Sequence, residues 1–480
     1  MSSPRKLFLG GEWRATADTT LVRNPFDGAA VAELHQATAA EIEEAVAIAD
    51  RAFDRARKLQ SFEREAMLLA IASGIEARRE EFARCIMAEG GKPITFARGE
   101  VSRAANTFRI AAEECKRLHG EVMSLDWTKD SPSRTGLTRR FPVGPVTAIS
   151  PFNFPLNLVA HKVAPALAAG NPVISKPAHQ TPLTALLLAE VVEQAGVPKG
   201  MFQVLPCLGP VAQALVTHPK IKIVSFTGSP PVGWKLKELA NKKKVTLELG
   251  GNAAAIIEPD ADLGFAADRI ALGAFAYAGQ VCISVQRVFV HGQVYDAFRT
   301  RLMGAVESKI RMGDPAEEST VVGPVIEDSA ADRIHGWIER ARNGGARLLS
   351  GGERRGRMIA PTVIEDARPE MEVCSKEVFG PVVVLQRYGE FGEAVAAAND
   401  SSYGLQAGVF TRDLPKLWRA FQELEVGGVI ANDYPMYRAD QMPYGGVKES
   451  GFGREGLRYA IEEMTEQRLL VLNFSPFPEV

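Results

Sequence analysis

Short apolar segments alternate with helical segments along residues 145–250, and this alternation constrains the fold more than any other feature of the chain. The expected strands occupy residues 146–149, 173–175, 202–205, 221–226 and 245–249, and the expected helices occupy residues 156–169, 183–195, 211–217 and 232–241. Strands that alternate with helices form a parallel sheet that is covered on both faces. The segment therefore predicts a doubly wound, Rossmann-like nucleotide-binding domain within an α/β protein.

The rest of the chain predicts a second α/β domain and a small β arm. A chain of 480 residues is too long for one core, so two or three domains are expected. Residues 39–119 have a helical pattern, and after residue 248 the alternation starts again with longer helices such as 263–277. The predicted division gives 1–120 and 140–247 to the nucleotide-binding domain, 248–450 to the second domain, and 121–139 with 466–480 to the arm.

The composition argues against several classes of partner and site. The chain has 56 basic and 58 acidic residues without a long basic run, so nucleic acid and anionic membranes are not expected partners. Its five cysteines form no CxxC pair, so neither a disulfide framework nor a metal site is expected. Residues 1–6 lack the apolar stretch of a signal peptide, and no window reaches the roughly 20 apolar residues of a membrane span. We expect a cytoplasmic protein.

Cys282 is the strongest candidate for a reactive residue. It follows Gly279, Gln280 and Val281, and Glu248 lies upstream in the apolar segment Leu-Glu-Leu-Gly-Gly. A lone cysteine in such a chain is usually an inert small hydrophobe, and a carboxylate in this setting can be a buried ion-pair partner. A cysteine framed by glycine and glutamine, with a single carboxylate in an apolar strand nearby, fits a nucleophile and its base better.

The ELGG and GQxC segments together resemble those of the aldehyde dehydrogenase superfamily, and further motifs follow in the family's order over nearly the whole chain. The resemblance implies that Cys282 attacks an aldehyde and that Glu248 activates the water that hydrolyses the thioester. It also implies that Asn153, in Pro-Phe-Asn-Phe-Pro, donates to the oxyanion beside the backbone N–H of Cys282. From the sequence alone, an Asx-type turn is an equally good role for Asn153.

Two segments are candidates for the dinucleotide loop. The literal GxGxxG at residues 451–456 follows a turn-rich loop instead of an apolar strand, so we reject it. Residues 226–233 lie where a predicted strand meets a helix, and a helix N-terminus attracts a pyrophosphate. The family binds NAD through an FTGS-x-x-x-G loop of this kind, which implies roles for Gly228, Ser229 and Gly233. Pro230 and Pro231 replace the usual Thr-Glu, and we expect one proline in the first helical turn.

Five further residues complete the cofactor site that the resemblance implies. Lys176, at a strand end, holds the adenine ribose, and His179 stands where NAD-preferring members often have glutamate. Leu249 is assigned to the same site. Glu377 is expected to bond the nicotinamide ribose, with Phe379 packing beside it. Without the glutamate at this position, a 2′-phosphate is not repelled, so both NAD and NADP stay open as the cofactor. NAD is favoured, because a histidine with an ordinary pKa is mostly neutral at neutral pH and would not attract the 2′-phosphate.

Three side chains suggest a small polar or anionic aldehyde as the substrate. Arg109 and Arg438 lie in segments that resemble those of lactaldehyde, non-phosphorylating glyceraldehyde-3-phosphate and phosphonoacetaldehyde dehydrogenases, and His161 is a further candidate. Arginine forks suit carboxylate, phosphonate or phosphate groups. Salt bridges are the alternative for both arginines, and a structural role is the alternative for His161. Val281 stands where the phosphate-using relatives commonly carry arginine, which weakens a phosphate substrate.

These observations predict an NAD(P)-dependent aldehyde dehydrogenase that forms a free carboxylic acid through a thiohemiacetal and a thioester. A CoA-acylating enzyme is the first alternative, and Glu248 disfavours it because such relatives lack this glutamate. A non-catalytic protein on the same fold is the second. The resemblance makes residues 248–450 the catalytic domain and implies a homodimer or a homotetramer built as a dimer of dimers. The tail at 468–474 is either a local edge strand or a strand that crosses to another subunit, and the family favours crossing.

Overall fold

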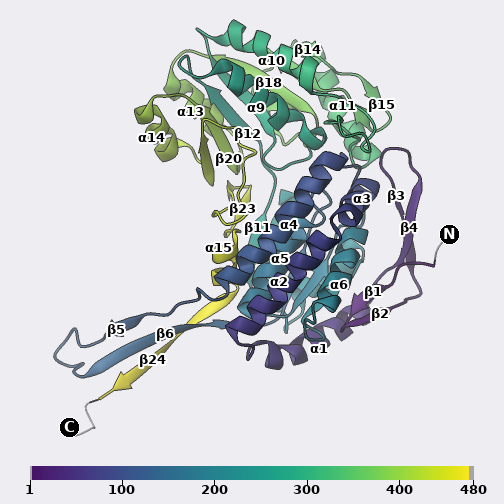
Figure 1. The fold of residues 1–480 in the computed structure, drawn as a ribbon. Helices are drawn as coiled ribbons and strands as arrows, with labels where there is room; N and C mark the ends of the chain where they lie inside the picture. The colour runs from purple at the N-terminus through teal and green to yellow at the C-terminus, as the bar shows by residue number, and fades with distance from the viewer. Residues whose placement is uncertain (1–2, 475–480) are drawn as a thin grey trace.

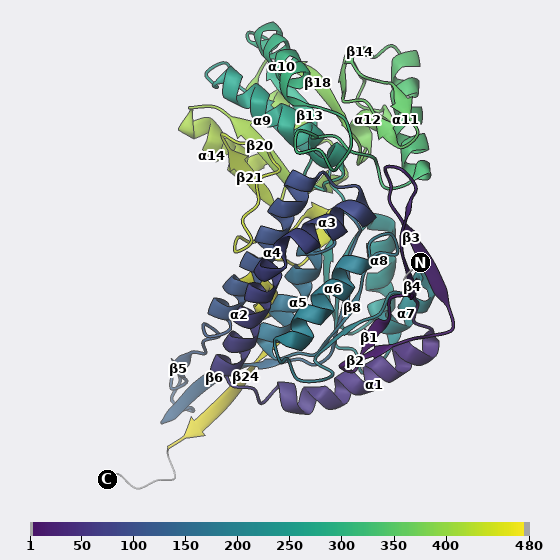
Figure 2. The same ribbon diagram turned by 45° about the vertical axis from the view of Figure 1, so that its right-hand side comes forward.

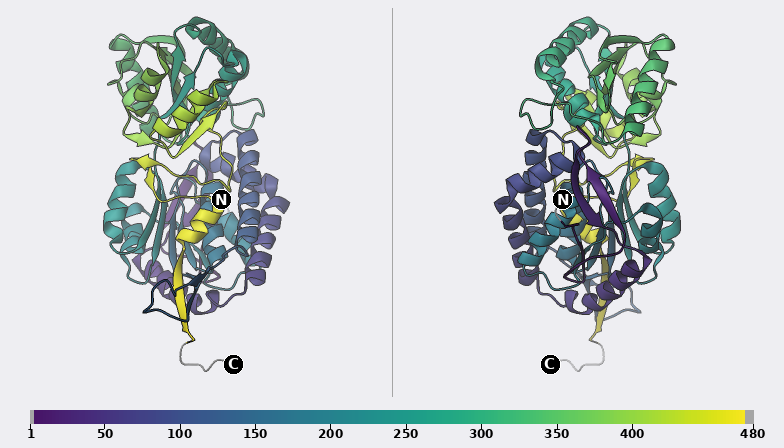
Figure 3. Two further views of the ribbon diagram at one scale, coloured as in Figure 1. Left: turned by 90° about the vertical axis from the view of Figure 1, so that its left-hand side faces the viewer. Right: turned by 90° about the vertical axis from the view of Figure 1, so that its right-hand side faces the viewer.

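The computed structural model describes residues 3–474 as two α/β units stacked on one another, with a β arm that projects from one of them (Figure 1). Each unit is built on one large twisted sheet. The first sheet lies in the lower part of Figure 1, the second sheet in the upper part, and the arm extends away from both. The side views in Figure 3 show the same stacking. The predicted α/β class with two units and an arm is confirmed.

The first sheet has eight strands in the order β2-β1-β9-β8-β7-β10-β11-β23. Its parallel strands are β7 (Val146–Ile149), β8 (Val173–Lys176), β9 (Phe202–Val204), β10 (Ile223–Thr227) and β11 (Lys244–Glu248). The chain passes from β7 outward through β8 and β9 and then returns to the other side of β7 as β10. The carboxyl ends of β7 and β10 therefore flank a topological switch point, the place where open α/β sheets bind ligands.

Helices cover both faces of the first sheet, as the alternation predicts. One face packs the helices α2 (Ser61–Ala77), α3 (Arg79–Gly90), α4 (Ile94–Glu114), α5 (Asn157–Ala169) and α6 (Leu183–Gln194) (Figure 2). The short helix α15 (Leu457–Glu463) packs into the same apolar cluster. The other face packs α1 (Ala39–Ala56), α7 (Gly209–Thr217) and α8 (Pro230–Ala240). Helix α1 shows the reason, because its apolar residues recur at helical spacing and are the buried ones.

The second sheet has seven strands in the order β14-β17-β18-β13-β12-β20-β21. They are β14 (Arg347–Ser350), β17 (Thr362–Glu365), β18 (Val382–Tyr388), β13 (Val285–His291), β12 (Ala253–Ile257), β20 (Gln406–Phe410) and β21 (Gly428–Ala431). One apolar cluster packs α9 (Leu263–Phe275), α10 (Tyr295–Lys309), α11 (Asp328–Asn343) and the short α12 (Glu372–Ser375), and another packs α13 (Phe391–Asn399) and α14 (Leu414–Glu423). The second α/β unit expected after Glu248 is thus present.

The arm is a three-stranded antiparallel sheet of β5 (Val122–Ser124), β6 (Arg134–Pro142) and β24 (Thr465–Asn473), with β24 at one edge. The apolar side chains of Leu469, Leu470 and Val471 are exposed on β24. The tail is therefore a strand that pairs with β6 of its own chain and leaves its other edge free within the described residues. Residues 475–480, which the arm was expected to include, lie outside the part that the structure describes.

Short strands complete the fold. They are β1 (Leu7–Leu9), β2 (Glu12–Arg14), β3 (Thr19–Arg23), β4 (Ala30–His35), β15 (Arg354–Arg355), β16 (Met358–Ile359), β19 (Tyr403–Gly404), β22 (Val447–Lys448) and β23 (Gly451–Phe452). The rejected GxGxxG begins at β23, which pairs with β11. A Cβ at Gly451 would approach the Leu247 carbonyl oxygen to 2.4 Å, so this glycine allows close strand packing. Among the described residues no helix has both the length and the apolar character of a membrane span.

Candidate active site

Cys282 lies where the two α/β units meet, in a loop that tight backbone packing holds in place. The loop follows a short 3-10 helix, Ala276–Gly279, in which Tyr277 and Ala278 adopt left-handed backbone angles. A Cβ at Gly279 would come within 2.1 Å of the Gly380 carbonyl oxygen, and one at Gly251 would come within 2.1 Å of the Cys282 carbonyl oxygen. The glycines of GQxC and ELGG are therefore required because three backbone segments touch around the cysteine.

Two cavities meet at the Cys282 side chain. We name them by the elements at their walls. The α4 cavity, of about 450 Å³, is lined in part by Phe96, Glu100, Arg103, Asn157, Tyr437, Arg438 and Tyr444. The β10 cavity, of about 640 Å³, is lined in part by Phe152, Asn153, Thr227, Gly228, Ser229, Leu249, Arg333, Glu377 and Phe379. Cys282 and Leu158 line both cavities, so a molecule in each could present reacting atoms to one thiol.

The surroundings of Cys282 favour the neutral thiol over the thiolate. Burial, with a smaller contribution from the charges of Glu377 and Glu248, raises the pKa of the thiol to about 11. The Tyr444 hydroxyl, 3.1 Å from Cys282 Sγ, and the nearby Arg438 act in the opposite direction. The sulfur therefore becomes a nucleophile only when its proton has left and the anion is stabilised.

Glu248 ends β11, beside Thr227 at the end of β10. Its side chain is buried, and neither carboxylate oxygen has a hydrogen-bond partner among the described residues. Burial, with the negative charge of Glu455, raises the pKa of Glu248 well above its ordinary value. A buried carboxyl group without a fixed partner is free to bond a water or a ligand, as a general base must.

Asn153 lies beyond β7 and faces the loop that carries the nucleophile. Its Nδ2 donates to the carbonyl oxygen of Gln280 over 2.9 Å, and its Oδ1 has no partner among the described residues. This bond ties Asn153 to the Cys282 loop instead of to an Asx turn. The amide carries a second N–H, which no described residue accepts.

The segment 226–233 has the predicted strand-to-helix geometry with one correction. Ser229 is the N-cap of α8, and the helix begins with Pro230 and Pro231, so both prolines lie in the first turn instead of one. Because proline has no N–H, this helix offers fewer free amides to a phosphate than expected. Gly233 of this helix packs closely against Leu249, since a Cβ at Gly233 would lie 2.4 Å from Leu249 Cδ2.

The other cofactor candidates lie at sheet ends. Lys176 ends β8, and burial lowers the pKa of its ammonium group. His179 is exposed, and partial burial together with the charge of Lys176 lowers its pKa, so it is neutral at neutral pH. Neither side chain lines the β10 cavity.

Glu377 and Phe379 line the β10 cavity. Glu377 accepts a hydrogen bond from the Gly251 N–H over 2.9 Å, and burial raises the pKa of its carboxyl group to about 7. Phe379 makes an edge-on contact with Phe152, with ring centroids 5.9 Å apart. Arg333, which the sequence did not single out, lines the same cavity with its guanidinium 4.7 Å from the Trp337 indole. It is a cation without an ion pair among the described residues.

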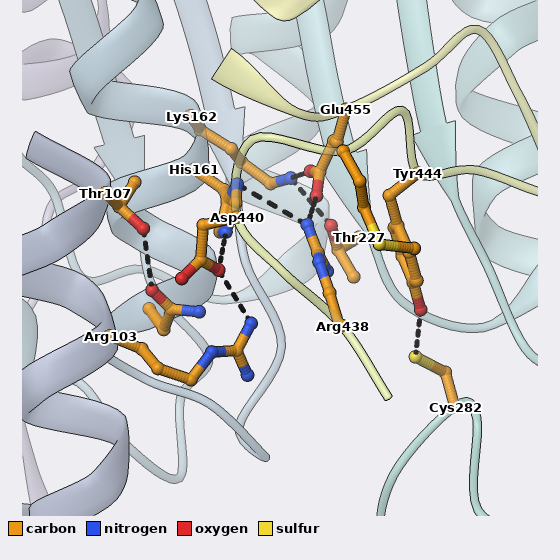
Figure 4. A network of polar contacts seen from close by, with 12 residues as sticks. Arg103, Thr107, His161, Lys162, Thr227, Cys282, Arg438, Asp440, Tyr444 and Glu455 are labelled. Carbon is orange, nitrogen blue, oxygen red and sulfur yellow. Dashed lines mark hydrogen bonds and ion pairs between the residues drawn. The ribbon is translucent and has the colours of Figure 1, made fainter. Parts of the chain in front are cut away.

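A buried polar network backs the α4 cavity (Figure 4). Lys162 Nζ donates to Glu455 over 2.8 Å and to Thr227 Oγ1 over 2.6 Å. Arg438 donates to the same Glu455 carboxylate over 2.9 Å, and its guanidinium lies 3.7 Å from the centroid of the Tyr444 ring. Burial opposes a lower pKa for Glu455, but the charges of Lys162 and Arg438 outweigh it and lower the pKa of this carboxyl group to about 2.

The second half of the network joins His161, Asp440 and Arg103. Asp440 Oδ1 accepts from Arg103 over 2.7 Å and lies 2.9 Å from His161 Nε2. Burial and the Arg438 charge lower the pKa of His161, so the ring is neutral. With Nε2 protonated toward Asp440, its Nδ1 faces Arg438 Nη2 at 3.4 Å.

Two of the three expected substrate residues lie elsewhere. Arg109 pairs with Glu76 on the surface and does not line the α4 cavity, because six helical residues separate it by about 240° from Arg103 on α4. His161 is buried behind the cavity wall and has the structural role that was its alternative. Arg438 does line the cavity.

The sequence did not point to four residues of this site, Arg103, Lys162, Tyr444 and Glu455, because no sequence motif marks them as functional. Helical spacing could have found Arg103, which shares a face with Phe96 and Gly99.

The chain is similar to known proteins over nearly its whole length. The family model described as "Aldehyde dehydrogenase family" matches residues 13–470. A 3-sulfolactaldehyde dehydrogenase of Priestia megaterium is 46% identical over 468 residues, which cover 97% of this chain and 98% of that protein. Aldehyde dehydrogenase 21 of Physcomitrella patens, solved with the reaction product succinate, superposes with a TM-score of 0.96 at 43% identity and covers 99% of this chain and 100% of that one. An NADP complex of a glyceraldehyde-3-phosphate dehydrogenase from Bacillus halodurans has a TM-score of 0.95 at 38% identity, with 98% of this chain and 100% of that chain covered.

Proposed function

The chain belongs to the aldehyde dehydrogenase family, and from this premise we propose that it oxidises a small anionic aldehyde to the free carboxylic acid with NAD(P)+. The observation that carries the proposal is the pair of guanidinium groups, Arg103 and Arg438, on the wall of the cavity that ends at Cys282. The chain is similar to relatives named for sulfolactaldehyde, lactaldehyde and sulfoacetaldehyde, which supports a short polar or anionic substrate.

The charge balance of the cavity wall supports an anionic tail on the substrate. In the network behind the cavity, Arg103, Lys162 and Arg438 face the carboxylates of Asp440 and Glu455, which leaves one positive charge uncompensated. The Nε–H groups of Arg103 and Arg438 have no acceptor among the described residues. A sulfonate or carboxylate in the α4 cavity would supply the missing negative charge and the missing acceptors.

Cys282 and Asn153 account for the first half of the reaction. The deprotonated sulfur attacks the carbonyl carbon of the aldehyde, and a thiohemiacetal oxyanion forms. The backbone N–H of Cys282 and the second Nδ2–H of Asn153 are the donors for that oxygen, and Asn153 is held at the nucleophile loop through Gln280. Bound NAD(P)+ supplies the acceptor for the hydride, and collapse of the oxyanion leaves a thioester on Cys282.

Glu248 accounts for the second half. Its raised pKa makes the ionised carboxylate a stronger base than an ordinary glutamate, so it takes a proton from water, and the hydroxide formed attacks the thioester carbonyl. The products are the carboxylic acid and the free thiol. A CoA-acylating enzyme would have to protect the thioester from this water, so Glu248 supports the hydrolytic reaction over that alternative.

The β10 cavity suits a dinucleotide cofactor. It lies at the switch point of the first sheet, and a Cβ at Gly250 would come within 2.4 Å of Glu377 Oε2, so the glycine leaves the carboxylate room. Ser229, Arg333 and Lys376, which line this cavity, would face the pyrophosphate, and Glu377 would face the nicotinamide ribose. Lys176 lies outside the cavity at the end of β8 and would bind the adenine ribose there. His179, neutral at neutral pH, would neither attract nor repel a 2′-phosphate strongly, so we favour NAD over NADP.

The free edges of the arm and of the second sheet favour a homodimer that can pair further into a tetramer. Strand β24 ends the arm sheet, and β21 ends the second sheet. Each presents unpaired backbone groups, and β24 adds exposed apolar side chains. Pairing of β24 with β21 of a second copy would satisfy both edges, and one chain alone cannot bring them together because the arm points away from β21 (Figure 2).

An initial-rate assay tests the proposed function directly. The purified protein is mixed with NAD+ or NADP+ and with 3-sulfolactaldehyde, succinate semialdehyde, lactaldehyde, glyceraldehyde-3-phosphate or butyraldehyde, and reduced nicotinamide is followed by absorbance. We expect the highest kcat/KM for an aldehyde with a sulfonate or carboxylate. Equal values for anionic and neutral aldehydes would remove the anionic substrate from the proposal, and no turnover with any aldehyde would favour a non-catalytic protein.

A further inference from the structure

Tyr444 holds a fixed position against the nucleophile. Its backbone N–H donates to the Glu455 carbonyl oxygen over 3.0 Å, and the Glu455 N–H donates back to the Tyr444 carbonyl oxygen over 2.6 Å. The side chain is buried in the wall of the α4 cavity, and its hydroxyl oxygen lies 3.1 Å from Cys282 Sγ. Figure 4 shows the phenol pointing at the sulfur.

A cation covers one face of the Tyr444 ring. The Arg438 guanidinium lies 3.7 Å from the ring centroid, and Glu455 holds it there through a 2.9 Å bond to Arg438 Nη2. Glu455 therefore fixes both the backbone of Tyr444 and the cation on its ring. A positive charge on the face of a phenol draws electron density from the ring, which makes its O–H a stronger donor.

We propose that Tyr444 is a catalytic residue whose hydroxyl donates a hydrogen bond to the Cys282 thiolate and stabilises it before attack on the aldehyde. The inference rests on the proposed role of Cys282 as the nucleophile. In the thiol state either atom can be the donor, but once the sulfur is an anion only the phenol can donate. Among the described side chains, Tyr444 alone makes a hydrogen bond to this sulfur.

Tyr444 acts as a donor and not as a base. Burial and the negative charge of a neighbouring thiolate raise the pKa of the phenol well above its ordinary value, so it keeps its proton while the sulfur loses one. The thiol proton leaves to water in the cavity, and the phenol proton stays on oxygen. When the thioester has formed, the sulfur is a poor acceptor, and the hydroxyl is released until the thiolate returns.

The test is the reactivity of Cys282 in Tyr444→Phe. This variant keeps the ring and the contact with Arg438 and removes one oxygen. Alkylation of Cys282 in the cofactor-free, full-length protein by iodoacetamide is followed by mass spectrometry of the Cys282 peptide from pH 6 to about pH 10. We expect alkylation in Tyr444→Phe to be about tenfold slower than in the unaltered protein below the thiol pKa, which corresponds to a rise of about one unit in that pKa.

Tyr437→Phe is the matched control, because Tyr437 lines the same cavity without a bond to the sulfur, and it should alkylate at the unaltered rate. Thiolate absorbance, measured as the difference from Cys282→Ala, gives the pKa a second time, and equal melting temperatures check the fold. An unchanged pH profile in Tyr444→Phe overturns the proposal, whether or not turnover falls. If Cys282→Ala kept full turnover, the proposed function itself would fail, whatever the alkylation result.

Discussion

Arg103 Nη2 donates to Asp440 Oδ1 over 2.7 Å, and this bond joins helix α4 to the loop before β22 beside the α4 cavity, which Arg103 lines. The same Asp440 oxygen binds His161, which in turn faces Arg438. One carboxylate thus orients both guanidinium groups that we assign to the substrate. The arrangement leads to a test with a control that lies on the same helix.

Arg103→Ala should lower the ratio of kcat/KM for succinate semialdehyde to that for butyraldehyde. A hydrogen bond to a charged group contributes roughly 1.5–3 kcal/mol, so the ratio should fall by about ten- to a hundredfold. Arg109→Ala, which removes a surface cation paired with Glu76, should leave the ratio unchanged. An equal effect in both variants would show that net charge acts at long range and that Arg103 does not contact the substrate.

Cys282→Ala should abolish turnover and leave cofactor binding intact. Among the described residues, Cys282 is the one nucleophilic side chain that lines both cavities, so its loss removes the nucleophile. The substitution leaves Glu377, Phe379 and Ser229 of the β10 cavity in place. Steady-state assays measure the first effect, and fluorescence titration with NAD+ and NADP+ measures the second. Normal turnover by the alanine variant would end the assignment.

Glu248→Gln should form one equivalent of reduced cofactor per active site and then stall at the thioester. The amide is close in shape to the carboxyl group but cannot take a proton from water. Stopped-flow absorbance gives the burst, and intact-protein mass spectrometry identifies the acyl adduct on Cys282. Full steady-state turnover would mean that another group is the base, and the absence of a burst would mean that Glu248 also removes the thiol proton.

Removal of residues 467–480 should yield monomers or insoluble protein. The truncation deletes most of β24, exposes β6 in its place, and takes away the edge that would pair with β21 of a second copy. Light scattering and sedimentation give the size of the particle. A soluble truncated protein with the oligomeric size of the full chain would contradict pairing through β24.

The Lys162–Glu455 pair should make stability sensitive to acid. The pKa of Glu455 is lowered to about 2, below its ordinary value of 4.5, so the carboxylate stabilises the fold fully above about pH 4.5 and progressively less as the pH falls toward 2. Glu455→Gln, which leaves Lys162 buried and unpaired, should cost about 3–5 kcal/mol at pH 7 and flatten this dependence.

Lys162→Met combined with Glu455→Gln serves as the control for that prediction, because it removes the unpaired charge and should recover part of the free energy of unfolding. Urea denaturation followed by circular dichroism from pH 3 to 7 gives these values. If the unaltered protein and Glu455→Gln lost stability with the same slope, the pair would not be the source of the acid sensitivity.

The sequence by itself determined the two α/β units and the candidate nucleophile. Strand and helix periodicity is a local property, so β7, for example, has the predicted bounds and α5 begins one residue later than expected. The glycines around Glu248 and Cys282 are visible in the sequence, but the reason for them is tertiary, because they permit close backbone contacts between segments that are distant in the chain.

Only the tertiary structure decided which polar side chains share a cavity. Arg103 and Arg109 look alike in sequence, yet helix α4 turns one toward Asp440 and the other toward Glu76. The groups that meet Arg438 and Tyr444 come from α5 and from loops more than a hundred residues apart, and no local pattern encodes such contacts. Their energies depend on burial and on the distances between charges, and both quantities exist only once the chain has folded.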